Sequence, residues 1–339
     1  MRTKIAIVIL NWNGGAMLEK FLPTLIKFSN YPGTEIIVTD NNSDDNSGTI
    51  MGEKFSDIPF IRLDKNYGFA EGYNIALSSV DAEYYILLNS DVEVTENWLS
   101  PLVEYLDSNP DIAACQPKLL SYKEPDLFEY AGASGGYMDK WGYLYCRGRI
   151  MNSIEQDKGQ YDDIVPVFWA TGAALMIRSK DYWNVGGLDA KFFAHMEEID
   201  LCWRLRRIGR EIVCIPASKV FHVGAATLKR ENPLKTYLNF RNNLLTLYKN
   251  LSANDLKRVM IIRIFLDMLA ALMFLLQGKF RDFSAVIRAR IHFAKMRSEY
   301  KEERERLSKI DMAGVDVKRG EFSILWQYYF KRVRKFSSL

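Results

Sequence analysis

A chain of 339 residues with 48% hydrophobic and 26% charged residues has an ordinary globular composition, which excludes an intrinsically disordered protein. Its net charge of +3 is close to neutral, although basic residues crowd into the segment after residue 229. The four cysteines form no CxxC pair, so we expect reduced thiols, a cytosolic protein and no cysteine-based metal site.

Short apolar runs alternate with helical patterns through the first part of the chain. In chain order we expect a strand over 4–10, a helix around 18–25 that Pro23 bends, strands over 35–40 and 60–63, and a helix over 68–79. The first run is too short for a secretory signal, and none is expected. This alternation with short connections predicts an α/β fold with a doubly wound, mainly parallel sheet.

The next apolar run, residues 84–88, leads into Asn89, Ser90 and Asp91. Five apolar and aromatic residues in a row are too few for a helix and indicate a strand buried on both faces. Ligands of such sheets bind outside the carboxyl ends of the strands, so Asp91 stands where a charged ligand or a metal would bind. The alternative is a solvated turn residue.

The second half of the domain is less regular. We expect a helix over 98–106, a strand over 112–115, an irregular insertion over 121–164, a strand, turn and strand over 165–177, a helix over 199–207, and a strand over 212–216 that closes the sheet. A boundary near residue 230 would separate a catalytic domain, 1–230, from a C-terminal helical region, 231–339.

Carboxylates gather at the predicted strand ends and turns. They are Asp40, Asp91 and the cluster Glu197, Glu198 and Asp200. His222 follows the last strand, where a structural role is the simpler interpretation; with carboxylate oxygens, however, an imidazole would complete a Mg²⁺ or Mn²⁺ site. The acidic cluster suits a helix N-terminus, but crowded carboxylates also raise one another's pKa, which suits a general base.

Five segments in order carry a family resemblance. They are Ile7–Asn13, Val38–Asp45, Asn66–Asn74, Asn89–Asp91 and Gly187–Arg204. Together they resemble the family 2 glycosyltransferases with a GT-A fold, the nucleotide-diphosphosugar transferase fold, and specifically the rhamnosyltransferase-like branch. The resemblance covers about residues 4–250. It departs from the common pattern at Asn89, which replaces the first Asp of the metal motif, and at Glu198, where an Asp is usual.

The resemblance implies site roles residue by residue. On the donor side, it implies nucleotide contacts by Asn11 and Asn13 at the end of the opening strand, by Asp40 and Asn42 at the nucleobase, and by Asn66, Gly68, Asn74 and Asn89 along the nucleotide. It places Asp91 and His222 at the metal or diphosphate. It makes Glu198 the catalytic base, with Glu197 and Asp200 beside it. The implied reaction is inverting transfer of one sugar from an NDP-sugar to an acceptor hydroxyl.

Two functions outside this family, and one other kind of enzyme within it, share some of these features. A sugar-phosphate nucleotidyltransferase should carry a basic, Gly-rich loop after the first strand, and residues 11–15 contain no basic residue. A noncatalytic nucleotide-sugar-binding module would not need the acidic cluster together with a metal site. A processive polysaccharide synthase should carry several transmembrane helices and a Gln-x-x-Arg-Trp motif, which the sequence lacks.

The last hundred residues combine apolar and basic patterns. Residues 259–276 are the most apolar stretch, and Arg263 and Asp267 within it could pair on one helix face. Residues 280–300 and 322–336 resemble basic amphipathic segments, which predicts a peripheral position on the cytoplasmic membrane face and a lipid-linked glycan acceptor of cell-surface polysaccharide synthesis. Packing on the catalytic domain, a homodimer interface or a spanning helix are the alternatives; nucleic acid is not expected.

Overall fold

Parallel strands alternating with helices form the first part of the molecule. The computed structural model describes residues 3–224, 232–310 and 319–339, so the expected boundary at residue 230 lies outside the described residues. The elements are β1 (Thr3–Asn11), α1 (Gly15–Phe28), β2 (Thr34–Asp40), α2 (Ser47–Lys54), β3 (Phe60–Arg62), α3 (Gly68–Ser78) and β4 (Ala82–Leu88). β1 pairs in parallel with both β2 and β4. These pairings confirm the predicted β-α-β-α-β order.

The second part of the sheet mixes strand directions. It contains β5 (Val92–Val94), α4 (Ser100–Ser108), β6 (Ile112–Ser121), β11 (Val165–Pro166), β12 (Ala174–Arg178), α5 (Ser179–Asn184), the 3-10 turn η1 (Ala190–Phe192), α6 (Glu197–Arg207) and β13 (Glu211–His222). The strand order is β11-β13-β6-β12-β4-β1-β2-β3, with β5 also pairing to β13. β12 runs antiparallel between β4 and β6. β13 is therefore an inner strand, and the expectation that it closes the sheet was wrong.

The segment expected to be irregular carries a second, smaller sheet. Its strands are β7 (Gly136–Met138), β8 (Leu144–Cys146), β9 (Arg149–Ile150) and β10 (Ser153–Ile154), joined as antiparallel neighbours. Strands of two or three residues show no measurable alternation, which is why the sequence pattern missed them. The final segment covers this sheet, because the ring of Phe336 lies 5.1 Å from that of Tyr137.

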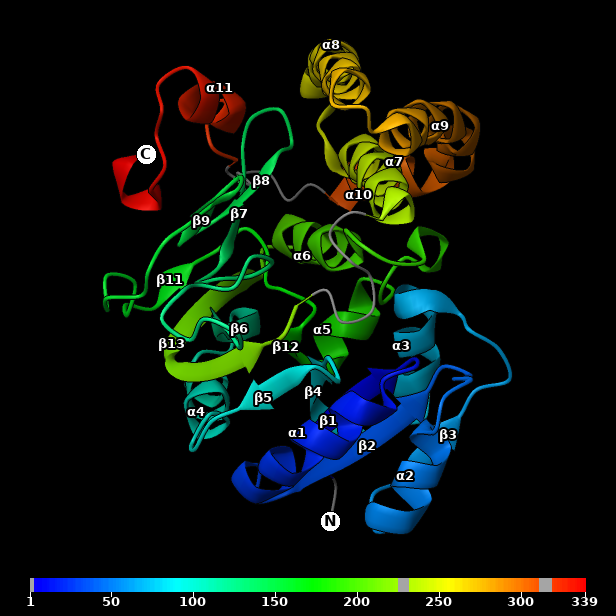
Figure 1. Ribbon diagram of the computed structural model, residues 1–339, viewed down its shortest axis with the longest axis vertical. Helices are drawn as coiled ribbons and strands as arrows, with labels where there is room; N and C mark the ends of the chain where they lie inside the picture. Colours follow the sequence, from blue (N-terminus) through cyan, green and yellow to red (C-terminus); the bar gives the residue numbers. More distant parts are fainter. Residues whose placement is uncertain (1–2, 225–231, 311–318) are drawn as a thin grey trace.

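Helices from the end of the chain complete the molecule. They are α7 (Pro233–Asn250), α8 (Ala253–Leu276), α9 (Phe280–Met296), α10 (Lys301–Ile310) and α11 (Ile324–Tyr329). α6 lies between the sheet and the layer of α7 to α10 (Figure 1). Leu244, Leu247 and Phe293 belong to the same buried cluster as Val8 and Leu87 of the sheet, so both parts share one core. Of residues 322–336, only the six of α11 form an α-helix, which corrects the expectation of a second long amphipathic segment.

Candidate active site

The turn after β4 brings Asp91 against the end of β13. Nε2 of His222 lies 3.1 Å from Oδ1 of Asp91, and its Nδ1 lies 3.4 Å from Oε1 of Glu129. All three side chains are buried. Burial lowers the pKa of His222, but its hydrogen bond to Asp91 and the negative charges of Asp91 and Glu129 outweigh burial and raise the pKa to about 10. Burial alone would raise the pKa of Asp91, but the hydrogen bond and the charge of His222 outweigh burial and keep that pKa below its ordinary value.

Glu129 was missed from the sequence. It lies in the segment expected to be irregular, and its Oε2 accepts a hydrogen bond from the amide of Ala131 at 2.5 Å. A carboxylate on the far nitrogen of a metal-binding histidine fixes the tautomer and the ring orientation. No local pattern marks such a residue, because its partner is distant in the chain.

The Asp91–His222 pair suits a small divalent cation. It offers one carboxylate and, once the imidazolium has given up its Nε2 proton, one imidazole nitrogen. Among the described residues, no third His, Cys, Asp or Glu side chain joins them as a metal ligand. Mg²⁺ is commonly bound through one or two carboxylates plus phosphates and water. The residues therefore fit an ion that takes its remaining ligands from a diphosphate and solvent.

A second cluster joins the turns after β1 and β2. Nδ2 of Asn11 donates to Oδ1 of Asp40 at 2.9 Å, and both Oδ1 and Oδ2 of Asp40 also accept hydrogen bonds from Ser43. Asn13 and Asn42 adopt left-handed backbone with φ of 52° and 59°, as asparagine tolerates in tight turns. Asn13 is exposed and Asn42 half-buried, so both line the outer side of this cluster.

The segment before α3 is held against the same turn. Oδ1 of Asn66 accepts from the Gly68 amide at 2.8 Å and from Nδ2 of Asn41 at 3.1 Å. Gly68 has φ of +75°, and a Cβ there would lie 2.6 Å from the carbonyl oxygen of Phe193, so only glycine fits. This glycine brings the start of α3 against the segment that precedes α6.

Two further predicted nucleotide contacts lie in different surroundings. Oδ1 of Asn74 accepts from the Tyr182 hydroxyl at 2.7 Å and from the Leu188 amide at 3.0 Å, so this amide braces the loop before α6. The backbone amide of Asn89 donates to the carbonyl of Ala173 at 3.0 Å, while its side chain is half-buried. Nucleotide contact by Asn74 and Asn89 stays a prediction.

Glu197 and Glu198 open α6. Their Oε2 atoms are buried and have no hydrogen-bond partner among the described residues. Burial raises the pKa of Glu198 to about 7, and burial together with Glu198 raises that of Glu197 well above its ordinary value. Gly172 lies next to Glu198, because a Cβ built on this glycine would be 3.7 Å from the Cβ of Glu198. The following residue, Ala173, accepts a hydrogen bond at its carbonyl from the amide of Asn89. Glu198 therefore lies close to the turn that carries Asp91.

Asp200 has different surroundings. Its Oδ2 accepts from Nε of Arg204 at 2.8 Å and from Nζ of Lys249 at 2.9 Å, and its Oδ1 accepts from Nδ2 of Asn250 at 2.8 Å. Burial opposes ionisation, but the two cations hold the pKa of Asp200 below its ordinary value. Such an ion-paired carboxylate joins α6 to α7 and is a poor proton acceptor.

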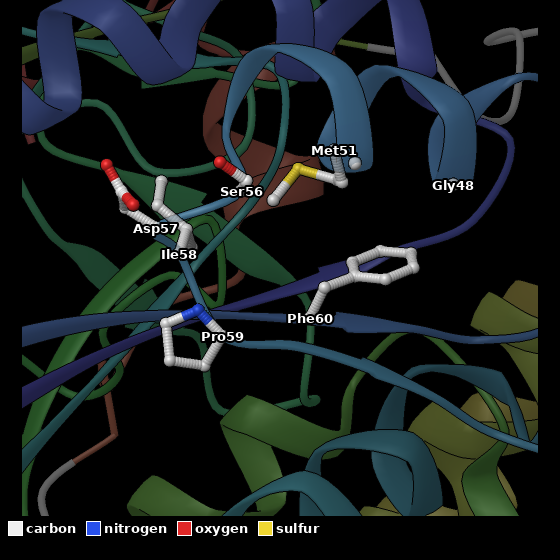
Figure 2. Close-up of a pocket in the computed structure, with 8 residues that line it drawn as sticks. Gly48, Met51, Ser56, Asp57, Ile58, Pro59 and Phe60 are labelled. Carbon is white, nitrogen blue, oxygen red and sulfur yellow. The ribbon is translucent and has the colours of Figure 1, made fainter.

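A shallow depression lies elsewhere, between α2 and β3. Figure 2 shows Met51 and Phe60 on opposite sides of it, and its lining also includes Asp57 and Pro59. None of its lining residues belongs to the clusters around Asp40, Asp91 or Glu198. It contributes nothing to the site described above.

The fold and these side chains define an α/β protein with polar clusters at the carboxyl ends of a doubly wound sheet, the place where such sheets bind their ligands. The sequence model described as "Glycosyl transferase family 2" matches residues 6–181, and the chain belongs to this family of glycosyltransferases. The family confirms the predicted class. It favours neither the nucleotidyltransferase nor the noncatalytic binding module.

Relatives with curated names place the chain near rhamnosyltransferases. It is 24% identical over 249 residues to the N-acetylglucosaminyl-diphospho-decaprenol L-rhamnosyltransferase of Mycobacterium tuberculosis, an alignment that covers 68% of this chain and 80% of that protein. It is 26% identical over 163 residues to the rhamnosyltransferase WbbL of Escherichia coli, covering 46% and 61%. These likenesses confirm the predicted resemblance to the rhamnosyltransferase-like branch.

Solved structures agree on the fold. Residues 1–349 of S. aureus TarS in complex with UDP-GlcNAc match with a TM-score of 0.56 at 13% identity, covering 91% of this chain and 90% of that one. The mannosyltransferase PcManGT of Pyrobaculum calidifontis, solved with GDP-Man and Mn²⁺, matches with a TM-score of 0.52 at 12% identity, covering 98% and 89%. The GT-A fold expected from the sequence is confirmed.

Proposed function

We propose that this glycosyltransferase moves one sugar from an NDP-sugar to an acceptor hydroxyl with inversion, and that Glu198 is the catalytic base. The observation that carries this proposal is Oε2 of Glu198, which is buried without a hydrogen-bond partner in the described residues, on a carboxyl with a pKa of about 7 close to the turn of Asp91. A general base works best when its pKa lies near the operating pH.

Exposure and pairing favour Glu198 over its two neighbours. Glu197 is only 4% exposed, whereas Glu198 is half-buried. Asp200 is neutralised by Arg204 and Lys249. In the reaction, the acceptor oxygen forms a bond to the anomeric carbon as Glu198 takes its proton. The bond from that carbon to the diphosphate oxygen breaks, and the nucleoside diphosphate leaves with its electron pair.

On the donor side, we propose that Asp91 and His222 hold Mg²⁺ or Mn²⁺. Such an ion, when bound, neutralises the negative charge that grows on the leaving diphosphate. Glu129 orients His222, and the turns held by Asn11 and Asp40 receive the nucleoside. The name of the Mycobacterium tuberculosis relative, which acts on a diphospho-decaprenol, supports a lipid-linked glycan acceptor, as in synthesis of a cell-surface polysaccharide.

Turnover assays with defined donors test the function. The chain is incubated with UDP-, TDP- or GDP-sugars, Mn²⁺, and a short-chain polyprenyl diphosphate carrying N-acetylglucosamine. We expect one donor class to release its nucleoside diphosphate in step with glycosylation of the acceptor, and the new linkage to have the opposite anomeric configuration to the donor. A retained configuration would contradict the single displacement and the role of Glu198.

We further propose that α8 lies on an anionic membrane surface. Within the described residues, α8 is the one helix long and apolar enough to cross a membrane, at 24 residues. Its charged pair points inward: Arg263 and Asp267 are buried and bonded to each other at 3.1 Å, while Asp267 also binds Arg290 at 2.5 Å. Its apolar side chains point outward, with Phe265 69% and Leu276 78% exposed. Because its apolar side chains face outward and its charged residues face the protein, α8 can contact lipid with its outer face while its inner face stays packed on the protein.

Other exposed groups support the same surface. Trp326 and Phe330 of the α11 segment stack with ring centres 4.3 Å apart, and both are exposed. α8 and α11 lie at the same end of the long axis of the molecule (Figure 1). Exposed basic residues accompany them, including Arg281, Arg288, Lys331 and Lys335. Each basic residue near an anionic surface contributes about 1 kcal/mol.

Sedimentation with vesicles of anionic phospholipid tests this membrane contact. The full chain should pellet with the vesicles at low salt and partly detach at high salt. Phe265→Asp should weaken binding by about tenfold or more, because burying a Phe side chain contributes about 1.5–3 kcal/mol. Ile26→Asp is the matched control, since Ile26 is similarly exposed but lies on α1 at the other end of the molecule. A wild-type chain that stays in the supernatant, and dimerises through α8, would contradict the proposal.

A further inference from the structure

The segment that leads into Glu197 and Glu198, residues 190–196, has an unusual backbone. We call it the entry loop. Phe193, His195 and Met196 all adopt positive φ, at 67°, 70° and 76°. Residues other than glycine rarely take this conformation, so surrounding contacts must hold the loop in place.

Those contacts come from outside the loop. Nδ2 of Asn242 on α7 lies 2.9 Å from the carbonyl oxygens of Phe192 and Ala194 and 2.7 Å from that of His195. The Phe193 carbonyl accepts from the amides of Phe69 and Ala70 at the start of α3. Asn242 is fully buried.

Arg241 completes the arrangement. Its Nη2 donates to the carbonyls of Lys191 and Phe192 at 3.1 and 2.9 Å, and its Nε donates to Oδ1 of Asn242 at 2.8 Å. Every carbonyl from Lys191 to His195 therefore accepts a hydrogen bond from α7 or α3. The fork of Arg241 also fixes which end of the Asn242 amide faces the loop.

The same helix holds the element that follows the loop. Lys249 and Asn250, near the end of α7, bind Asp200 in the first turns of α6. The entry loop and α6 are thus attached to one rigid helix on both sides of Glu198.

We infer that Asn242 is a positioning residue, whose three hydrogen bonds hold the entry loop in the left-handed conformation that places the Glu198 carboxylate for proton transfer. This inference rests on the proposed function in taking Glu198 as the base. A displacement of about 1 Å in a reacting group lowers the rate by roughly 100-fold. The chemistry, rather than donor affinity, should therefore suffer when the loop is released.

Asn242→Asp tests the inference with little change of shape. The new oxygen cannot donate to the three carbonyls and repels them, while the other oxygen still accepts from Arg241. We expect kcat to fall by roughly 100-fold with the Kd of the preferred nucleoside diphosphate, chosen among UDP, TDP and GDP, changed by less than about threefold. Hydrogen exchange of the entry-loop amides should become faster.

Asn239→Asp is the matched control. Asn239 lies on the same helix and its amide donates to the Lys235 carbonyl of that helix, so the change adds the same charge without touching the loop. It should leave kcat and loop exchange near wild type. Asn242→Ala removes the donors without adding charge, and gives the same readouts if the Asp variant does not fold.

Two results would overturn the inference. A kcat within about threefold of wild type in Asn242→Asp would mean that the loop keeps its shape without these bonds. A parallel fall in kcat, nucleotide affinity and melting temperature would assign Asn242 a purely structural role. The failure of the proposed function is a separate outcome: if Glu198→Gln stays active while Asn242→Asp loses kcat, the loop positions a different base.

Discussion

Glu198→Gln should lower the rate of sugar transfer by about 1,000-fold while the donor binds almost normally. General-base catalysis contributes roughly 100- to 10,000-fold, and glutamine keeps the shape of the side chain but cannot take the proton. Turnover of the preferred donor measures the first effect, and calorimetry with the same donor measures the second. The matched control is Glu104→Gln, which makes the same change at an exposed glutamate of α4, outside the segments assigned to the donor and the base.

The pH profile of the wild-type enzyme gives an independent check. Burial raises the pKa of Glu198 to about 7, and the base works only when it is ionised. The rate should therefore fall as pH drops below about 7, with an apparent pKa that belongs to the Glu197–Glu198 pair. If Glu198→Gln retains transfer within tenfold of wild type, the base is Glu197, and Glu197→Gln becomes the decisive variant.

Asp91→Asn should abolish the tightening of nucleoside diphosphate binding by Mn²⁺. The wild-type chain supplies one carboxylate and one imidazole there, so losing the anionic ligand leaves only His222 for the ion. We expect titrations of UDP, TDP and GDP with and without Mn²⁺ to differ by roughly tenfold or more for wild type and to coincide for the variant.

Two further variants separate metal binding from nucleotide binding. Glu129→Gln should weaken Mn²⁺ binding by about 10- to 100-fold, the usual effect of removing the group that orients a metal-bound histidine. Asp40→Asn should weaken nucleotide binding equally with and without Mn²⁺, because Asp40 organises the nucleoside-side turn. Unchanged metal dependence in Asp91→Asn would remove the ion from this pair and leave His222 a structural residue.

The sheet could be predicted because it follows from local patterns. Residues 4–10, 35–40 and 84–88 are apolar runs, and buried strands need little else. Asp91 follows β4, and His222 is the last residue of β13, which pairs with Val92. The structure brings the two side chains within 3.1 Å of each other, and their role in holding a metal stays a prediction.

The remainder depends on contacts between distant parts of the chain. The sequence does not separate Asp200 from Glu198 as a base, because one of the two cations that neutralise Asp200 is Lys249, which lies 49 residues later in the chain. Glu129 sits in a segment whose strands are too short to show periodicity. Asn242 lies on a helix whose sequence carries no motif. Its role depends on the carbonyls of the entry loop, about 50 residues earlier in the chain, where the backbone adopts a rare left-handed conformation.

The core shared by the sheet and the late helices has a consequence for how the molecule comes apart. Leu244 and Phe293 pack in the cluster that contains Val8 and Leu87, and Lys249 is fully buried against Asp200. Removing one partner of a buried ion pair costs about 3–5 kcal/mol, so the sheet cannot lose the helices without exposing apolar surface and breaking the buried pair of Lys249 and Asp200. Heat should therefore melt the two parts in one cooperative transition. The sugar-transfer machinery and the surface that would meet the membrane are gained or lost together.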